Sequence, residues 1–396
     1  MRLLIHDYSG HPFQAQLSRE LARRGHEVVH SSCPAYSSGK GRLEPGPGDR
    51  FVYEAVGAGR VIEKMRFRRR LLVEARLGVD LLRQVRRVRP DVALVANVPI
   101  PMLVVVAAGM LLLRRRWLLW QQDVQAVAVA KFAGKQLSRA FTLVARAFDV
   151  AERWCSRRAA GVVVIAESFL AVHERWGTAA KAHLIPNWAP LDEIVPVARD
   201  NAWSAEHGLT GVPTLLYSGT LGLKHDPALL VRLARRVIDA GAQVRLVVVN
   251  EGPAEAVLRE ESQRLGVPLT LLPFQPYDRL PEVLGSGDVL VALLEQDAGA
   301  FSVPSKTLSY LCAARPVLGL MPAENLASRL VAEADGCVLP PSEDALDEAA
   351  AWVRTVLGDP EHALLVGKKS RELAEQEFAL DDCADRFETL LAEAAG

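Results

Sequence analysis

The sequence predicts an α/β protein made of two doubly wound, Rossmann-like domains. Three observations predict this fold. The length of 396 residues suits two or three domains. Short apolar runs alternate with helix-like stretches, as a parallel sheet covered on both faces requires. Prolines at 186, 190 and 196 interrupt this pattern midway and mark a hinge. With 50% hydrophobic and 24% charged residues, the composition excludes a disordered chain and a coiled coil.

The first domain is expected over residues 1–190 and opens with a βαβ unit. An apolar strand at 3–6 leads into Ser9 and Gly10, and an amphipathic helix then ends near Gly25. The next strand is expected at 26–31. Later apolar runs predict three further strands, at 92–96, 117–120 and 162–166.

The second domain, expected over 191–375, repeats the alternation. A strand at 214–218 is followed by a loop and by a helix over about 227–240, which Gly241 ends. Four more strands are expected, at 244–249, 269–273, 289–293 and 316–319. The last residues, 376–396, are expected to form a helix that crosses back to the first domain. Because ligands of such sheets bind beyond the carboxyl ends of the strands, we expect two facing domains with the binding site in the cleft between them.

Charge is divided unevenly along the chain. The totals are 47 Lys and Arg against 47 Asp and Glu, but residues 1–200 hold 31 of the basic and 18 of the acidic residues, a net charge of +13, which leaves −13 for the remainder. Either the first half faces an anionic surface or acceptor, or the two halves attract each other. The five cysteines are scattered and fit neither a zinc site nor a disulfide framework, which favours a reducing cytoplasm.

One strongly apolar stretch raises the question of a membrane. Residues 101–113 are apolar but stop at three arginines, 114–116, short of the roughly 20 residues that span a bilayer. The first ten residues do not resemble a signal peptide. A buried helix is the expected structure. The alternative is a monotopic patch in which this stretch and the basic segment 64–70 rest on anionic headgroups.

Two glycine-containing loops precede helices and suit an anion. In the first domain, Ser9 and Gly10 lie where unpaired backbone N–H groups favour negative charge, although an ordinary tight turn explains them as well. In the second domain, Ser218, Gly219 and Thr220 are followed by Lys224, which suits a diphosphate. The spacing is not that of a Walker A loop. A surface lysine on a tight turn is the alternative.

Three more segments of the second domain are candidates for nucleotide or sugar binding. Asn250 and Gly252 end one strand, and Pro273 and Phe274 end the next, where packing explains the phenylalanine nearly as well. Residues 301–307 place hydroxyls and a cation at an expected helix start, which again suits an anion or a sugar hydroxyl.

Asp123 is the best acid/base or sugar-hydroxyl candidate in the first domain. It follows the strand at 117–120, so its carboxylate is expected at the carboxyl end of the sheet. Capping of the next helix is the alternative role. We find no group of residues with metal-ligand spacing and no Gly-x-Ser-x-Gly motif, so no metal and no cofactor are expected.

Taken together, these segments resemble a known family. The sequence is similar to the retaining GT-B glycosyltransferases that use nucleotide sugars. It looks most like the exopolysaccharide branch with colanic-acid fucosyltransferase-like and L-fucosamine transferase-like enzymes. Six segments carry the resemblance: RGHEV at 24–28, QQD at 121–123, IPNW at 185–188, YSGTLGLKH at 217–225, the block at 273–291, and VPSKTLSYLCAARPVL at 303–318.

The resemblance implies roles for individual residues. Gly219, Thr220 and Lys224 would contact the donor diphosphate, Asp123 would face the transferred sugar or the acceptor, and Asp123 and Lys224 would be the catalytic pair. The nucleotide and sugar would be approached by Pro304, Ser305, Lys306 and Ser309.

The chain departs from the wider superfamily in two respects. The superfamily's Glu-x7-Glu pair aligns with Phe301 and Ser309, so both carboxylates are absent. Its phosphate-binding arginine aligns with Thr220, which leaves Lys224 to carry more of the charge. A diphosphate clamp of different construction is therefore expected.

The implied activity is metal-independent transfer of a sugar from a nucleoside diphosphate sugar with retention at the anomeric carbon. The expected acceptor is a lipid-linked glycan of exopolysaccharide or cell-surface polysaccharide synthesis, at the cytoplasmic face of an anionic inner membrane. A small soluble acceptor, as in antibiotic tailoring or thiol metabolism, is the alternative. A catalytically inactive sugar-nucleotide-binding subunit is an alternative of another class. No nucleic acid is expected as a partner, and an NAD-dependent dehydrogenase is disfavoured because no Gly-x-Gly-x-x-Gly follows a strand with an acidic residue about 20 positions on.

Overall fold

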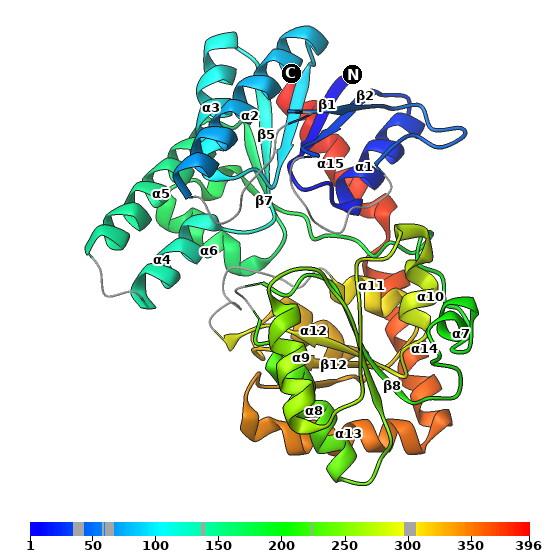
Figure 1. The fold of residues 1–396 in the computed structure, drawn as a ribbon. Helices are drawn as coiled ribbons and strands as arrows, with labels where there is room; N and C mark the ends of the chain where they lie inside the picture. The colour runs from blue at the N-terminus through cyan, green and yellow to red at the C-terminus, as the bar shows by residue number, and fades with distance from the viewer. Residues whose placement is uncertain (35–42, 58, 60–66, 136–138, 223–224, 297–305) are drawn as a thin grey trace. The chain divides into compact units, whose positions relative to one another are not determined.

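A computed structural model describes residues 1–34, 43–57, 59, 67–135, 139–222, 225–296 and 306–396 (Figure 1). The chain forms two compact units. The first contains Met1–Asn187 together with Leu380–Gly396, and the second is Trp188–Ala379. Each unit is built around one parallel sheet, which confirms the α/β class and the presence of two Rossmann-like folds.

The sheet of the first unit has the strand order β3-β2-β1-β4-β5-β6-β7. All of its neighbouring strands pair in parallel. The order reverses between β1 and β4, because the chain first adds strands on one side of β1 and then on the other. The strands are β1 (Arg2–Asp7), β2 (Glu27–Ser32), β3 (Val52–Ala55), β4 (Val92–Ala96), β5 (Arg116–Gln121), β6 (Gly161–Val164) and β7 (Ala182–Leu184).

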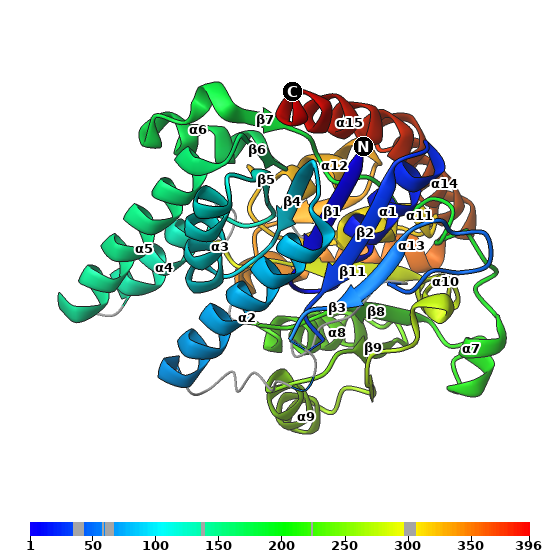
Figure 2. The ribbon, with the colours of Figure 1, turned by 90° about the horizontal axis from the view of Figure 1, so that it is seen from above.

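The helices of this unit cover the sheet. Helices α2, α3 and α5 pack side by side, and α1 packs beside α15 (Figures 1 and 2). The helices are α1 (Pro12–Arg23), α2 (Phe67–Val88), α3 (Ile100–Leu113), α4 (Gln125–Lys135), α5 (Arg139–Arg158), α6 (Glu167–Trp176), the 3₁₀ turn η1 (Ala179–Lys181) and α15 (Leu380–Ala395).

Helix α3 is the apolar stretch noted in the sequence. One side of it is buried through Met102, Val106 and Met110, and Gly109 allows a close approach to α2, since a Cβ there would lie 2.1 Å from Leu82 Cδ1. At its carboxyl end Leu112 is 84% exposed. The stretch is therefore a helix with one buried side. Among the described helices, none is both long enough and apolar enough to cross a bilayer.

The C-terminal helix α15 belongs to the first unit. The ring of Phe387 packs against Trp120 of β5, with the ring centroids 4.5 Å apart. Glu388 accepts hydrogen bonds from Arg24 (2.9 Å) and pairs with His26 (2.7 Å). An apolar contact and ion pairs thus fix α15 to this unit.

The sheet of the second unit has the order β10-β9-β8-β11-β12-β13, again with parallel pairs, and it reverses between β8 and β11. Its core is mostly aliphatic and includes Leu215, Leu246 and Val291. The strands are β8 (Thr214–Ser218), β9 (Arg245–Val249), β10 (Leu269–Leu272), β11 (Val289–Leu293), β12 (Val317–Leu320) and β13 (Cys337–Leu339). The helices are α7 (Ala202–Glu206), α8 (Ala228–Asp239), α9 (Ala254–Leu265), α10 (Leu280–Gly285), α11 (Lys306–Cys312), α12 (Leu326–Glu333), α13 (Leu346–Gly358) and α14 (Pro360–Glu377), with 3₁₀ turns η2 (Tyr277–Arg279) and η4 (Glu343–Ala345).

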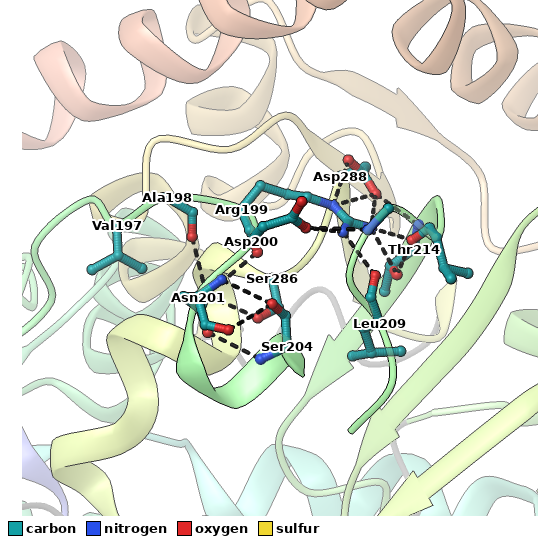
Figure 3. A network of polar contacts seen from close by, with 12 residues as sticks. Val197, Ala198, Arg199, Asp200, Asn201, Ser204, Leu209, Thr214, Ser286 and Asp288 are labelled. Carbon is teal, nitrogen blue, oxygen red and sulfur yellow. Dashed lines mark hydrogen bonds and ion pairs between the residues drawn. The ribbon is translucent and has the colours of Figure 1, made fainter. Parts of the chain in front are cut away.

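The segment that enters the second unit is anchored at the amino ends of β8 and β11 (Figure 3). The Arg199 guanidinium pairs with Asp288 (3.1 Å) and donates to the carbonyl of Leu209 (2.8 Å). Asp288 also accepts from the backbone N–H of Thr214 (2.7 Å). Asn201 caps α7 and donates to the carbonyl of Glu282 (3.0 Å). This network holds the entering segment at the amino ends of these strands, which is the end of the sheet opposite their carboxyl ends.

The sequence analysis missed three short strands. These are Val52–Ala55, Ala182–Leu184 and Cys337–Leu339. Two of them are edge strands of the first sheet and one is an edge strand of the second, and most of their residues are only partly buried. Edge strands need no continuous apolar run, so the hydrophobic pattern did not reveal them.

Candidate functional site

The points at which the strand orders reverse lie at β1/β4 in the first unit and at β8/β11 in the second. In open parallel sheets, ligands bind beyond the carboxyl ends of the strands at such points. The loops after β1 and β8 contain Ser9, Gly10, Gly219 and Thr220, and other predicted residues follow β5, β9 and β10.

In the second unit, the backbone after β8 turns at Gly219. Its N–H donates to the carbonyl of Val249 (3.0 Å), which extends the pairing with β9 by one residue. The φ angle of Gly219 is +140°, a conformation that other residues rarely adopt. A Cβ at this position would lie 3.0 Å from Nζ of Lys306. Glycine is favoured here by its backbone conformation, and a side chain would also make the lysine shift.

Lys306 is the first residue of α11 and reaches back to β8. Its ammonium donates a hydrogen bond to the Tyr217 hydroxyl and lies 3.8 Å from the centroid of the Tyr217 ring. Burial lowers the pKa of Lys306 to about 7. The structure thus brings Ser218, Gly219 and Lys306 together at one loop, with a cation next to partly buried backbone.

Two tyrosines that the sequence analysis did not select hold this loop in place. The Tyr310 hydroxyl accepts from the backbone N–H of Ser218 (2.9 Å) and donates to its carbonyl (3.1 Å). The Tyr217 hydroxyl donates to the carbonyl of Thr220 (3.0 Å). Burial raises the pKa of both phenols, so both stay neutral. The sequence signals them only as one tyrosine near the end of β8 and another in α11.

Asn250 links this loop to the end of β9. Its Oδ1 accepts from the N–H of Leu221 (2.8 Å), while its buried Nδ2 has no hydrogen-bond partner among the described residues. Gly252 follows with a φ of +126° and is exposed. After β10, Pro273 is exposed and Phe274 is partly buried. The N–H of Phe274 donates to Glu251 (3.1 Å), so the two loops touch.

The remaining candidates of the second unit are placed only in part. Ser309 lies on α11, three residues after Lys306, and is partly buried. Thr220 is exposed. Lys224, Phe301, Pro304 and Ser305 lie outside the described residues.

In the first unit, four polar residues meet after β1 and β4. Asp7 is buried and accepts hydrogen bonds from the N–H groups of Ser9 (3.2 Å) and His11, which fixes the loop. Burial raises the pKa of Asp7. Asn97, with a φ of +56°, donates through Nδ2 to the Ser9 hydroxyl (2.9 Å) and approaches His11 Nδ1 at 3.2 Å. Gly10 has a φ of +78°.

Asp123 follows β5 and is partly exposed. The residue before it, Gln122, forms a reciprocal amide pair with Asn187, with N···O distances of 2.9 and 2.8 Å. Asp123 belongs to the first unit and Lys306 to the second.

The start of α4 is capped by Glu152 of α5. Its carboxylate accepts from the N–H groups of Gln125 (3.3 Å) and Ala126 (2.6 Å) and from the Gln121 side chain (2.7 Å). Burial raises the pKa of Glu152 to about 7. Because Glu152 comes from another helix, local sequence rules had no means of finding this cap.

No metal centre is evident in the part of the chain that the structure covers. There, no three His, Cys, Asp or Glu side chains gather as a metal ion would need.

Comparison with known proteins adds a family match and two curated relatives. Residues 11–188 match the glycosyl transferase 4-like domain. The chain is 27% identical over 295 residues to the putative colanic acid biosynthesis glycosyl transferase WcaI of Escherichia coli (strain K12), which covers 71% of this chain and 70% of that protein. It is also 27% identical over 249 residues to the 2-deoxystreptamine glucosyltransferase of Streptomyces kanamyceticus, which covers 59% and 60%.

Solved structures extend the likeness to the whole chain. Anabaena HepE, crystallised with UDP and glucose, superposes with a TM-score of 0.74 at 14% identity and covers 99% of this chain and 100% of that one. Sucrose-phosphate synthase from Thermosynechococcus elongatus gives 0.73 at 17% identity, with 99% and 98% covered. At these identities the likeness concerns the fold.

Proposed function

We propose that this chain, a glycosyltransferase with the GT-B fold, takes its sugar from a nucleoside diphosphate donor and transfers it with retention of the anomeric configuration. One observation carries the donor assignment. In the second unit, the Gly219 backbone and the Lys306 ammonium lie side by side at the carboxyl end of β8. A cation beside a glycine, which lets a ligand approach the backbone closely, suits a diphosphate.

The other donor contacts follow from neighbouring loops. Lys224 supplies a second cation to the diphosphate, together with Ser218 and Thr220. The nucleoside and sugar are bound by the loops after β9 and β10 and by the start of α11, with the residues Asn250, Gly252, Pro273, Phe274, Pro304, Ser305, Lys306 and Ser309. Structures of HepE with UDP and with UDP-glucose support this class of donor.

Retention follows if the acceptor attacks from the face that the diphosphate leaves. The leaving diphosphate then takes the proton of the acceptor hydroxyl, and no enzyme nucleophile is needed. Lysines and backbone N–H groups stabilise the departing charge, so neither a metal ion nor a cofactor is required. Asp123 faces the transferred sugar or the acceptor. Replacing Lys224 by alanine is expected to lower kcat on the order of 10²-fold, and turnover at the wild-type rate would remove Lys224 from this role.

The donor is tested by thermal shift with UDP, GDP, ADP and TDP and their sugars. A ligand at 100 times its Kd should stabilise the protein by about 2.7 kcal/mol. The anomeric configuration of the product, read by NMR, tests retention, and activity in EDTA tests metal independence. If no nucleotide stabilises the protein, the donor assignment is wrong; an inverted product removes retention alone.

For the acceptor, we favour a lipid-linked glycan at the cytoplasmic face of an anionic membrane. The support is an exposed stripe on α2, which we call the α2 stripe. Its residues recur every three or four positions along one helix face and are all basic or aliphatic. The α2 stripe consists of Arg69, Leu72, Arg76, Val79, Arg83 and Arg86.

Helix α3, which packs against α2, and helix α5, which packs against α3, expose similar residues. Leu111 and Leu112 are exposed on α3, and Leu143 and Val150 on α5. Aliphatic side chains insert at the headgroup boundary, and each arginine near an anionic leaflet contributes about 1 kcal/mol. The relative named for colanic acid biosynthesis also favours polysaccharide assembly.

Co-sedimentation with vesicles tests this surface. The protein is expected to bind vesicles that contain anionic lipid, to release at high salt, and to ignore neutral vesicles. Replacing Arg76 and Arg83 by glutamine should weaken binding, whereas the same change at the exposed Arg259 of the second unit should not.

A small soluble acceptor is the alternative, supported by the relative that glucosylates 2-deoxystreptamine according to its name. Absence of vesicle binding favours it. The missing carboxylates at Phe301 and Ser309 support a second alternative, a catalytically inactive sugar-nucleotide-binding subunit. Donor hydrolysis or sugar transfer by the purified chain excludes that alternative.

A further inference from the structure

We propose that Lys306 takes up a proton from solvent when the donor binds and returns it after the nucleoside diphosphate has left. The proposal rests on the donor site described above. The new element is that Lys306 becomes positively charged only when the donor binds. An exposed surface lysine would be positively charged at all times.

The surroundings of Lys306 are the first argument. Nζ contacts the ring face and the hydroxyl of Tyr217 and lies beside the backbone of Gly219. Among the described residues, no carboxylate lies within ion-pair distance of this ammonium. An aromatic face and a phenol stabilise an ammonium less well than water and a counter-ion do together.

The groups that face Lys306 are the second argument. Tyr217 faces it from β8, and Tyr310 lies one turn along α11. Both phenols are buried and neutral, since burial raises the pKa of each. On α14, Arg371 donates to the carbonyl of Cys312 (3.2 Å), at the other end of α11. Neither the tyrosines nor Arg371 supplies negative charge.

Desolvation without a counter-ion favours the neutral amine. In agreement, burial lowers the pKa of Lys306 to about 7, so the side chain is partly neutral near neutral pH. A diphosphate placed at Gly219 supplies the missing negative charge and raises the pKa of the lysine. The amine lone pair then binds one solvent proton, and no bond of the donor changes in this step.

Two unpaired polar groups near the loop are available to a further ligand. The buried Nδ2 of Asn250 and the buried hydroxyl of Thr307, the residue after Lys306, have no hydrogen-bond partner among the described residues. Buried polar groups are rarely left unpaired unless a ligand or water completes them. Binding of the donor would therefore both protonate Lys306 and give hydrogen-bond partners to Asn250 and Thr307.

Isothermal titration calorimetry of UDP-glucose in buffers of different ionisation enthalpy tests the proposal, because it counts protons. UDP-glucose has no titrating phosphate near neutral pH, so any proton taken up belongs to the protein. We expect close to one proton per donor at about pH 8 and close to none at about pH 6. The affinity should fall by up to about tenfold per pH unit above pH 7.

Lys306→Arg is the matched variant, because arginine stays protonated throughout this range. It should bind with no proton uptake and with an affinity that does not change with pH. Equal proton counts in the wild type and in Lys306→Arg would overturn the proposal while leaving the donor site intact. If UDP-glucose and the other nucleotide sugars all fail to bind the wild type, the donor assignment itself is wrong.

A second variant covers the case in which the larger guanidinium does not fit. Lys306→Gln is neutral at every pH, so its weakened affinity should be the same at pH 6 and pH 9. A pH slope equal to that of the wild type in this variant would place the proton elsewhere and overturn the proposal.

Discussion

At the scale of single residues, two glycines of the same loop differ in what they require. Gly219 has a φ of +140°, and a Cβ there would lie 3.0 Å from the Lys306 ammonium, whereas Gly222 has open space around it and no positive φ. Of these two glycines, the backbone conformation therefore requires Gly219 and not Gly222. The sequence alone shows both as equal.

Gly219→Ala is expected to weaken donor binding, because it strains the backbone and displaces the Lys306 ammonium. Backbone strain of this kind costs on the order of 1–3 kcal/mol, which corresponds to a loss of about 5- to 150-fold in affinity. Titration with a nucleotide sugar measures the effect. Gly222→Ala is the control and should bind as the wild type does; equal losses in both variants would show that the loop does not depend on Gly219.

At the scale of secondary-structure elements, most strands could be predicted from the sequence. Most of the side chains that hold the loops after these strands could not. Strands β4, β8 and β11 have the predicted bounds, because buried parallel strands are short continuous apolar runs. The loops that carry Ser218, Asn250 and Phe274 were found because they follow such strands.

The supports of these loops come from distant parts of the chain. Tyr310 is 92 residues from Ser218, and Glu152 is 26 residues from Ala126. A hydrogen bond between distant residues leaves no periodic trace in the sequence. The site loops could therefore be located from the sequence, but not the side chains that hold them.

The cap of α4 by Glu152 gives a prediction for pH. The pKa of Glu152 is raised from its ordinary value of 4.5 to about 7 by burial, so between these values the unfolded chain binds fewer protons than the folded one. Stability from this group is therefore present at low pH and is lost as the pH rises toward 7, by at most about 1.4 kcal/mol per pH unit.

Glu152→Gln removes this titration. The stability of the wild type relative to Glu152→Gln should fall between about pH 5 and pH 8, as measured by thermal unfolding of both proteins at each pH. Glu167→Gln changes an exposed carboxylate in the same unit and serves as the control. A constant difference between the wild type and Glu152→Gln across this range would show that Glu152 is ionised throughout.

At the scale of the whole molecule, charge follows the two units. The first unit, with its C-terminal segment, holds 31 Lys and Arg against 20 Asp and Glu, a net charge of +11, and the second holds the remaining 16 against 27, a net charge of −11. Residues 380–396 contribute five acidic residues and one basic residue to the basic unit. An acidic helix thus docks on a basic unit, in agreement with the pairing of Glu388 with Arg24.

The units should also respond separately to core mutations. Phe387 is fully buried against the first unit, so Phe387→Ala is expected to cost about 3–5 kcal/mol there. Calorimetry should show a lowered transition for the first unit and an unchanged one for the second. The exposed Thr389→Ala on the same helix should shift neither, and a shift of both transitions by Phe387→Ala would show that the units unfold together.

The return of α15 has a consequence for a chain that has been cut. The polypeptide passes between the units twice, after Asn187 and after Ala379, and the two passages are joined by a hydrogen bond from Ala189 to Phe378 (2.8 Å). If a protease cuts the proline-rich passage after Asn187, the two fragments therefore stay together. The larger, C-terminal fragment contains α15, and α15 packs in the first unit, to which the smaller fragment belongs. Such a nick would be visible on a denaturing gel and invisible on a sizing column.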